Sequence, residues 1–156
     1  MTLIRTQDVI QSVAEALQYI SYYHPIDFVR AVSEAYEMEE SAAAKDAMAQ
    51  ILINSRMCAM GHRPICQDTG IVNVLVSVGM DVNWDATMSF DDMINEGVRR
   101  GYTHPDNVLR GSVLVDPDGE RRNTKDNTPA VIHTKIVAGD KVEIEVAAKG
   151  GGSEAK

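Results

Sequence analysis

The chain has little cysteine and little aromatic character, with two cysteines, one tryptophan and two phenylalanines in 156 residues. Cys58 and Cys66 are too few for the disulfide framework of a small secreted domain. They also do not form a Cys-x-x-Cys pair, so neither a zinc knuckle nor a thioredoxin-like redox site is indicated. We therefore expect two free thiols.

The chain also lacks long apolar runs and a basic surface. No stretch is apolar for long enough to span a bilayer, and no basic start followed by an apolar segment suggests a signal peptide. The net charge of −8, with a pI near 4.9, argues against a nucleic-acid surface, which needs clustered lysine and arginine. We expect a cytoplasmic protein that binds neither nucleic acid nor a membrane.

Hydrophobic spacing predicts three helices in the first part of the chain. Val9, Ile10, Val13 and Leu17 recur at three- and four-residue intervals, which predicts an amphipathic helix beginning near Thr6. Pro25 suits the first turn of a second helix, and Ser41 is a suitable N-cap for an alanine-rich third helix.

The later part of the chain predicts strands and one more helix. Residues 71–76 read as a strand, and Ser89 begins a predicted helix that ends near Tyr102. Residues 131–137 and 141–146 form two apolar strands joined by a short turn, which predicts a hairpin covered on one side; residues 118–127 read as a loop. The expected fold is α+β, with amino-terminal helices, a small mixed or antiparallel sheet and a further helix, in a single domain of residues 1–156.

The most informative motif is the connection between the third helix and the first strand. It places the thiol of Cys66, the amide of Gln67 and the carboxylate of Asp68 in consecutive positions before Gly70. Short connections between rigid elements commonly carry active-site groups. Asp68 has a simpler alternative, because Asp-Thr-Gly can form a side-chain-to-backbone turn.

This motif and four further segments resemble class I fumarate hydratases and the related tartrate dehydratase alpha subunit. The matching segments are ILINSRM (51–57), CQDTG (66–70), DNVLR (106–110), NTKDNTPA (123–130) and AKGGGSE (148–154). The resemblance implies an iron-sulfur hydro-lyase that hydrates fumarate to (S)-malate, a reaction of the tricarboxylic acid cycle. It also implies a [4Fe-4S] cluster held by three cysteines and a homodimer of the full-length protein.

The resemblance assigns roles to five residues. Cys66 would be a cluster ligand, and Asp68 would be the catalytic base or would orient it. Gln67 and Arg110 would bind a substrate carboxylate, and Gly152, in the triple glycine, would let backbone N–H groups approach an anion. A dianionic substrate needs such local positive charge in an acidic protein.

Several alternatives stay open. Only Cys66 falls in a ligand motif, so the chain is expected to be the amino-terminal part of a longer enzyme, inactive alone and unable to hold a cluster. The substrate could instead be tartrate or another hydroxy-dicarboxylate. The chain could also be a non-catalytic subunit that completes the cluster site with a partner, or a simple acidic binding module. Cys58 is expected to be a small buried hydrophobe.

Overall fold

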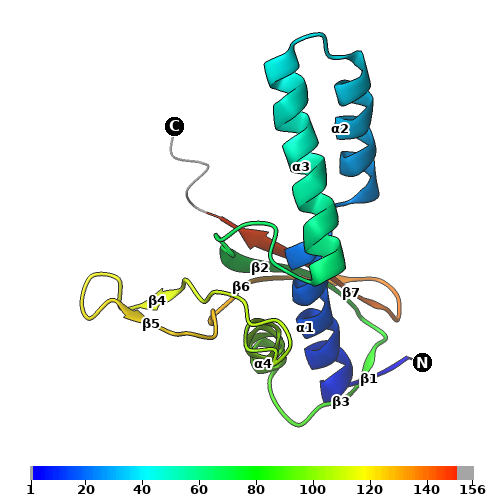
Figure 1. Ribbon diagram of the computed structural model, residues 1–156. Coiled ribbons are helices and arrows are strands. Elements are labelled where there is room, and N and C mark those ends of the chain that lie inside the picture. The colour runs from blue at the N-terminus through cyan, green and yellow to red at the C-terminus, as the bar shows by residue number, and fades with distance from the viewer. Residues whose placement is uncertain (1, 151–156) are drawn as a thin grey trace. The chain divides into compact units, whose positions relative to one another are not determined.

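The computed structural model describes residues 2–150 and divides the chain into two compact units (Figure 1). One unit combines the amino-terminal residues up to Gln18 with the chain from Gln67 onward, and the other comprises Tyr19–Cys66. Gly152 lies outside the described residues. No helix of residues 2–150 is long and apolar enough to cross a membrane.

The first unit is built from short strands and from helices at two distant positions in the sequence. The strands are β1 (Leu3–Arg5), β2 (Ile71–Gly79), β3 (Asn83–Asp85), β4 (Leu114–Val115), β5 (Arg122–Asn123), β6 (Val131–Val137) and β7 (Val142–Lys149). The helices are α1 (Thr6–Tyr22) and α4 (Phe90–Tyr102). The predicted α+β class and the predicted start of α1 at Thr6 are confirmed.

The three longest strands form a mixed sheet in the order β6-β2-β7. β6 pairs with β2 in parallel and β7 pairs with β2 in antiparallel orientation. The predicted hairpin of residues 131–137 and 141–146 is therefore wrong, because β2 lies between the two strands. β2 is more apolar than β6 and β7. In the central position, both edges of β2 are hydrogen-bonded to a neighbouring strand.

Gly79 allows the β6–β7 connection to pass over the end of β2. Its N–H donates to the carbonyl of Lys141 at 2.8 Å, and a Cβ on Gly79 would lie 2.7 Å from the carbonyl carbon of Gly139. Any side chain at position 79 would thus push this connection off the strand end. The loop predicted over residues 118–127 is also interrupted, since β5 pairs there with β4.

The core of the first unit lies between α1, α4 and one face of the sheet. Val72, Val74, Val76 and Val78 of β2 are buried and alternate with exposed or half-buried residues. The helices contribute further apolar core side chains, and Leu109 after α4 adds one more; the helical ones are Val9, Ile10, Val13, Ala14, Leu17, Met93, Ile94, Val98 and Tyr102. Ser89 caps α4 as predicted, because its hydroxyl accepts from the Asp92 N–H.

The close crossing of α4 on α1 depends on a glycine. A Cβ at Gly97 would lie 2.7 Å from the Cβ of Val13 and 2.9 Å from the carbonyl oxygen of Ile10. Both distances are shorter than van der Waals contact, so a side chain would separate the two helices.

We expect Gly97→Ala to destabilise the first unit by about 1–3 kcal/mol, the usual cost of overpacking a core. The measurement is the midpoint of thermal unfolding. Gly61→Ala is the matched control, because Gly61 is also helical and its Cβ would meet nothing closer than 3.7 Å. Equal midpoints for the two variants would contradict the tight crossing.

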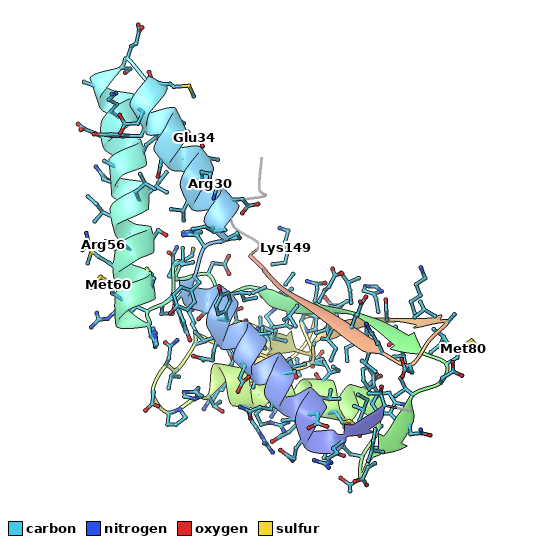
Figure 2. The ribbon with its side chains drawn as sticks, turned by 90° about the vertical axis from the view of Figure 1, so that its right-hand side faces the viewer. Arg30, Glu34, Arg56, Met60, Met80 and Lys149 are labelled. Atoms are coloured by element: carbon cyan, nitrogen blue, oxygen red, sulfur yellow. The ribbon has the colours of Figure 1, made fainter. Side chains whose placement is uncertain are left out.

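The second unit is a helical hairpin of α2 (Ile26–Met38) and α3 (Ala42–Gly61). Pro25 directly precedes α2, and the Ser41 hydroxyl accepts from the Ala44 N–H at the start of α3, as predicted for its cap. Figure 2 labels Arg30 and Glu34 on α2, together with Arg56 and Met60 on α3.

Candidate functional site

The motif of residues 62–70 follows the carboxyl end of α3. His62 ends that helix in the left-handed conformation, with φ of 46°. Cys58, in the last turns of α3, is buried and donates to Asn54 Oδ1 at 3.6 Å and to the Pro64 carbonyl at 3.7 Å. Cys66 is exposed. The two thiols thus differ as the sequence predicted, and only Cys66 is accessible to a ligand.

Asp68 begins a tight turn into β2. Its Oδ1 accepts from the Gly70 N–H at 3.0 Å, which is the side-chain-to-backbone turn considered from the sequence. Gly70 has φ of 71°, and a Cβ there would collide with the backbone of Lys149. A Cβ at Gly150 would lie 3.0 Å from Asp68 Oδ2, so the second carboxylate oxygen lies close to the Gly150 backbone.

Tyr102 and Thr69 fix the backbone beneath this turn. The buried Tyr102 hydroxyl donates to the Thr69 carbonyl at 2.7 Å, and the Thr69 hydroxyl donates to the Arg110 carbonyl. Tyr102 comes from the end of α4, so the helix directly positions the motif. The backbone of Arg110 is thereby tied to the residue that follows Asp68.

Asn127 forms further hydrogen bonds between the Asp68 turn and the segment that follows Arg110. It is completely buried, and its Nδ2 donates to the Gly70 carbonyl at 2.8 Å. Its Oδ1 accepts from the N–H groups of Ser112 at 2.7 Å and Val113 at 3.2 Å. One amide side chain therefore holds the turn after Asp68 against the segment after Arg110.

These ties bring Gln67, Asp68 and Arg110 into one neighbourhood of the first unit. Arg110 is exposed, and its guanidinium Nη1 donates to the Gln67 carbonyl at 3.4 Å. A guanidinium can bind a carboxylate with paired hydrogen bonds, and a carboxylate can accept a proton, so the two side chains carry groups suited to a small anionic molecule.

Two further arginines of the first unit, Arg99 and Arg100, bind acidic side chains near α4. Arg99 and Arg100 both bind Glu96, at 2.5 and 2.7 Å, and Arg99 also binds Asp126 at 3.0 Å. The hydrogen bond from Arg100 holds the pKa of Glu96 below its ordinary value, against the effect of partial burial. These charges stabilise one another at the surface of α4, as expected for solvated side chains.

The described residues do not form a metal site by themselves. Among residues 2–150, no three His, Cys, Asp or Glu side chains gather closely enough to hold a metal ion. Cys66 offers one accessible thiolate donor, which suits iron, whereas Cys58 is engaged in the interior of its own unit. This part of the chain can thus contribute one ligand to a cluster.

The titration of the Tyr102 phenol tests whether this residue is buried in the hydrogen-bonded region around Thr69. Burial, with the nearby charge of Asp68 as a smaller cause, raises the pKa of Tyr102 to about 12 from the model-compound value of 10.0. A phenol with a raised folded-state pKa stabilises the fold fully below pH 10.0, and this contribution is lost as the pH rises toward 12.

We therefore expect Tyr102→Phe to remove a late-titrating component from the absorbance titration of the tyrosines, near pH 12. The loss of the buried hydrogen bond should also cost about 1 kcal/mol of stability at neutral pH. If wild-type and variant titration curves coincide, the Tyr102 hydroxyl is not buried against Thr69.

Sequence reasoning did not identify the residues that hold the site together. Tyr102 was predicted only as the end of a helix, and Thr69 and Asn127 only as members of matching segments. Their roles depend on contacts between positions far apart in sequence, such as the hydrogen bond between Gly70 and Asn127, which are separated by 57 positions. The presence of Thr69 in the CQDTG segment and of Asn127 in the NTKDNTPA segment was the available signal.

The sequence of the chain is similar to those of two proteins with assigned functions. A protein of Methanocaldococcus jannaschii, provisionally assigned as L(+)-tartrate dehydratase subunit alpha, is 29% identical over 145 residues, which are 91% of this chain and 50% of that protein. The anaerobic class I fumarate hydratase of Escherichia coli is 32% identical over 121 residues, 78% of this chain and 22% of that enzyme. The chain thus spans at most about half of these relatives.

The family comparison covers nearly the whole chain. The profile of the fumarate hydratase (Fumerase) family matches residues 10–156, a range that includes the motif, Arg110 and Asn127. The resemblance identified from the sequence is therefore confirmed. The chain belongs to the fumarate hydratase (Fumerase) family.

Proposed function

We propose that the chain is the amino-terminal part of an iron-sulfur hydro-lyase that interconverts fumarate and (S)-malate. The observation that carries the proposal is a set of hydrogen bonds that connects the Asp68 turn with the segment around Arg110. The Thr69 hydroxyl donates to the Arg110 carbonyl, and the Asn127 amide donates to the Gly70 carbonyl. Family membership supports the hydro-lyase class. The cytoplasm, where free thiols persist, is the proposed location.

The proposed work of this chain is binding and proton transfer. The Arg110 guanidinium would bind one substrate carboxylate with two parallel hydrogen bonds, and the Gln67 amide would bind the same group. Asp68 would take the proton from the carbon next to a carboxylate during dehydration and return it during hydration. Gly152 would let backbone N–H groups approach the substrate.

Cys66 is the proposed contribution to a [4Fe-4S] cluster. When bound, such a cluster with one iron free of protein ligands supplies a Lewis acid for the substrate hydroxyl. The remaining thiolates would come from outside this chain, either from a longer polypeptide or from a partner subunit. The designation of the M. jannaschii relative as a subunit alpha supports the partner arrangement. A homodimer is also part of the proposal.

Tartrate is the second candidate substrate, because that relative is assigned as an L(+)-tartrate dehydratase subunit. The test is an assay of the complete, anaerobically purified protein with fumarate, (S)-malate, tartrate and citrate. We expect turnover of fumarate and (S)-malate, with citrate inert. A preference for tartrate would mean that tartrate is the substrate and would leave the proposed reaction class unchanged. The absence of turnover with any hydroxy acid would refute the proposal.

A further inference from the structure

The residue before Cys66 has both of its backbone polar groups hydrogen-bonded. The Ile65 N–H donates to the Ser21 carbonyl at 2.8 Å, and the Ile65 carbonyl accepts from Asn54 Nδ2 at 3.4 Å. Ser21 lies near the end of α1 and Asn54 in α3, and all of these residues belong to the unit Tyr19–Cys66. The Ile65 carbonyl is part of the planar peptide group that leads to Cys66, so Asn54 helps to orient the backbone from which the thiol extends.

The amide of Asn54 is itself oriented by a neighbour on α3. Its Oδ1 accepts from the Cys58 thiol at 3.6 Å, one turn further along the helix. An amide whose oxygen accepts this bond turns its NH₂ group, which is a donor only, toward the Ile65 carbonyl. In Figure 2, the labels of Arg56 and Met60 mark this part of α3. Asn54 therefore connects the helix to the segment before Cys66 with a defined orientation of its amide.

An aromatic contact holds the other end of the same segment. The His62 ring stacks on the Tyr22 ring, with centroids 4.5 Å apart and an interplanar angle of 13°. The Tyr23 hydroxyl lies 3.5 Å from His62 Nε2. Both tyrosines directly follow Ser21 at the end of α1. Residues 62–65 are thus attached at both of their ends to helices of their own unit.

These contacts go beyond what is needed to end α3. His62 already ends that helix in the left-handed conformation, and the Arg63 N–H donates to the Cys58 carbonyl at 3.1 Å. The hydrogen bonds of Ile65 lie after this helix end. They act only on the stretch of chain that leads to Cys66.

We propose that Asn54 and His62 are positioning residues for Cys66, and that they hold its backbone in place before a cluster binds. The inference rests on the proposed function, in which Cys66 is a cluster ligand. A ligand whose backbone is already ordered loses less conformational freedom on binding, so the metal is held more tightly. Residues that orient a metal ligand act in this way without contacting the metal.

The first test is amide hydrogen exchange in the 156-residue chain, followed by NMR. Asn54→Asp keeps the oxygen that accepts from Cys58 and removes the NH₂ group that donates to Ile65. The segment should open more often, so the Ile65 N–H should exchange about two- to tenfold faster, the effect of one lost hydrogen bond. His62→Asn tolerates the left-handed conformation but lacks the ring, and should have an effect of similar size.

Gln50→Glu is the matched control, because it makes the same amide-to-carboxylate change at an exposed position one turn before Asn54 on α3. It should leave the exchange of Ile65 unchanged. Asn54 and His62 are also exposed, so the N–H of Val74, in the buried part of β2, should exchange at the wild-type rate in every variant. Wild-type exchange of Ile65 in both Asn54→Asp and His62→Asn would overturn the proposal.

The second measurement is the rate at which a chelator removes iron from the anaerobically purified complete protein. Asn54→Asp and His62→Asn should lose iron about two- to tenfold faster than the wild type, and Gln50→Glu should not, since only the first two variants remove the ordering of Cys66. A purely structural role at the end of α3 would leave this rate unchanged, and that result would also overturn the proposal.

The two measurements separate the failure of this inference from the failure of the proposed function. A wild-type complete protein that holds no iron would refute the proposed function, and the ligand role of Cys66 with it. The exchange rates of Ile65 do not depend on iron. Iron that is bound by the wild type and released at equal rates from all variants would refute only the positioning role of Asn54 and His62.

Discussion

Asp68→Asn should lower the turnover number of the complete enzyme by about 10²- to 10⁴-fold, the range for loss of a general acid or base. Its fold should be retained. An asparagine side-chain oxygen can still accept the hydrogen bond that Asp68 Oδ1 receives from the Gly70 N–H at 3.0 Å. The substitution therefore removes the proton acceptor and leaves the turn in place.

The measurement is steady-state hydration of fumarate, with kcat and KM determined separately. Arg110→Lys provides the contrast, because the ammonium cannot bind a carboxylate in the bidentate manner of the guanidinium, so KM should rise as well. Asp106→Asn, at an exposed aspartate, is the matched control. An Asp68→Asn enzyme with wild-type kcat would show that Asp68 serves only the turn.

Local features of this fold were accessible from the sequence. Helix starts follow from the chemistry of single residues, and the hydroxyls of Ser41 and Ser89 accept the expected backbone N–H groups. The alternation of Val142, Ile144 and Val146 with charged residues also predicted a strand with one apolar side, and these three side chains are half-buried. Such signals span only a few residues.

The pairing of the strands was not accessible in this way. A short turn between two apolar strands usually makes a hairpin, and nothing in the periodicity of residues 131–146 indicates that β2 separates them. The deciding feature is Gly79, where the connection crosses the end of β2 without meeting a side chain. That contact joins positions about sixty residues apart, which local patterns do not report.

In the candidate site, too, local features could be predicted from the sequence and long-range contacts could not. The reactive side chains of Cys66, Gln67 and Asp68 could be proposed from their order in the motif. The framework that places Arg110 beside Gln67 could not, because it depends on the buried contacts of Tyr102 and Asn127.

Cys66→Ser should abolish hydratase activity of the complete protein. Substituting a residue that only hydrogen-bonds to a metal ligand typically lowers metal affinity or activity by about 10- to 100-fold. Substituting a direct ligand should therefore lower the activity by more than about 100-fold. Serine is nearly isosteric with cysteine but is a poor ligand for a cluster that prefers soft thiolates. Cys66 is exposed, so the substitution should leave the fold intact.

Cys58→Ser is the matched control, because the serine hydroxyl can keep the donation to Asn54 and to the Pro64 carbonyl. This variant should retain activity and iron. A complete protein that lost function equally in both variants would indicate a general requirement for the thiols rather than a ligand role of Cys66.

The most direct test of the central claim, that this chain provides one ligand of an iron-sulfur hydro-lyase, is the iron content of the anaerobically purified complete protein, determined with its fumarate hydration rate. The proposed function predicts that iron and activity fall together in Cys66→Ser and persist in Cys58→Ser. Full iron content and wild-type hydration in Cys66→Ser would contradict it.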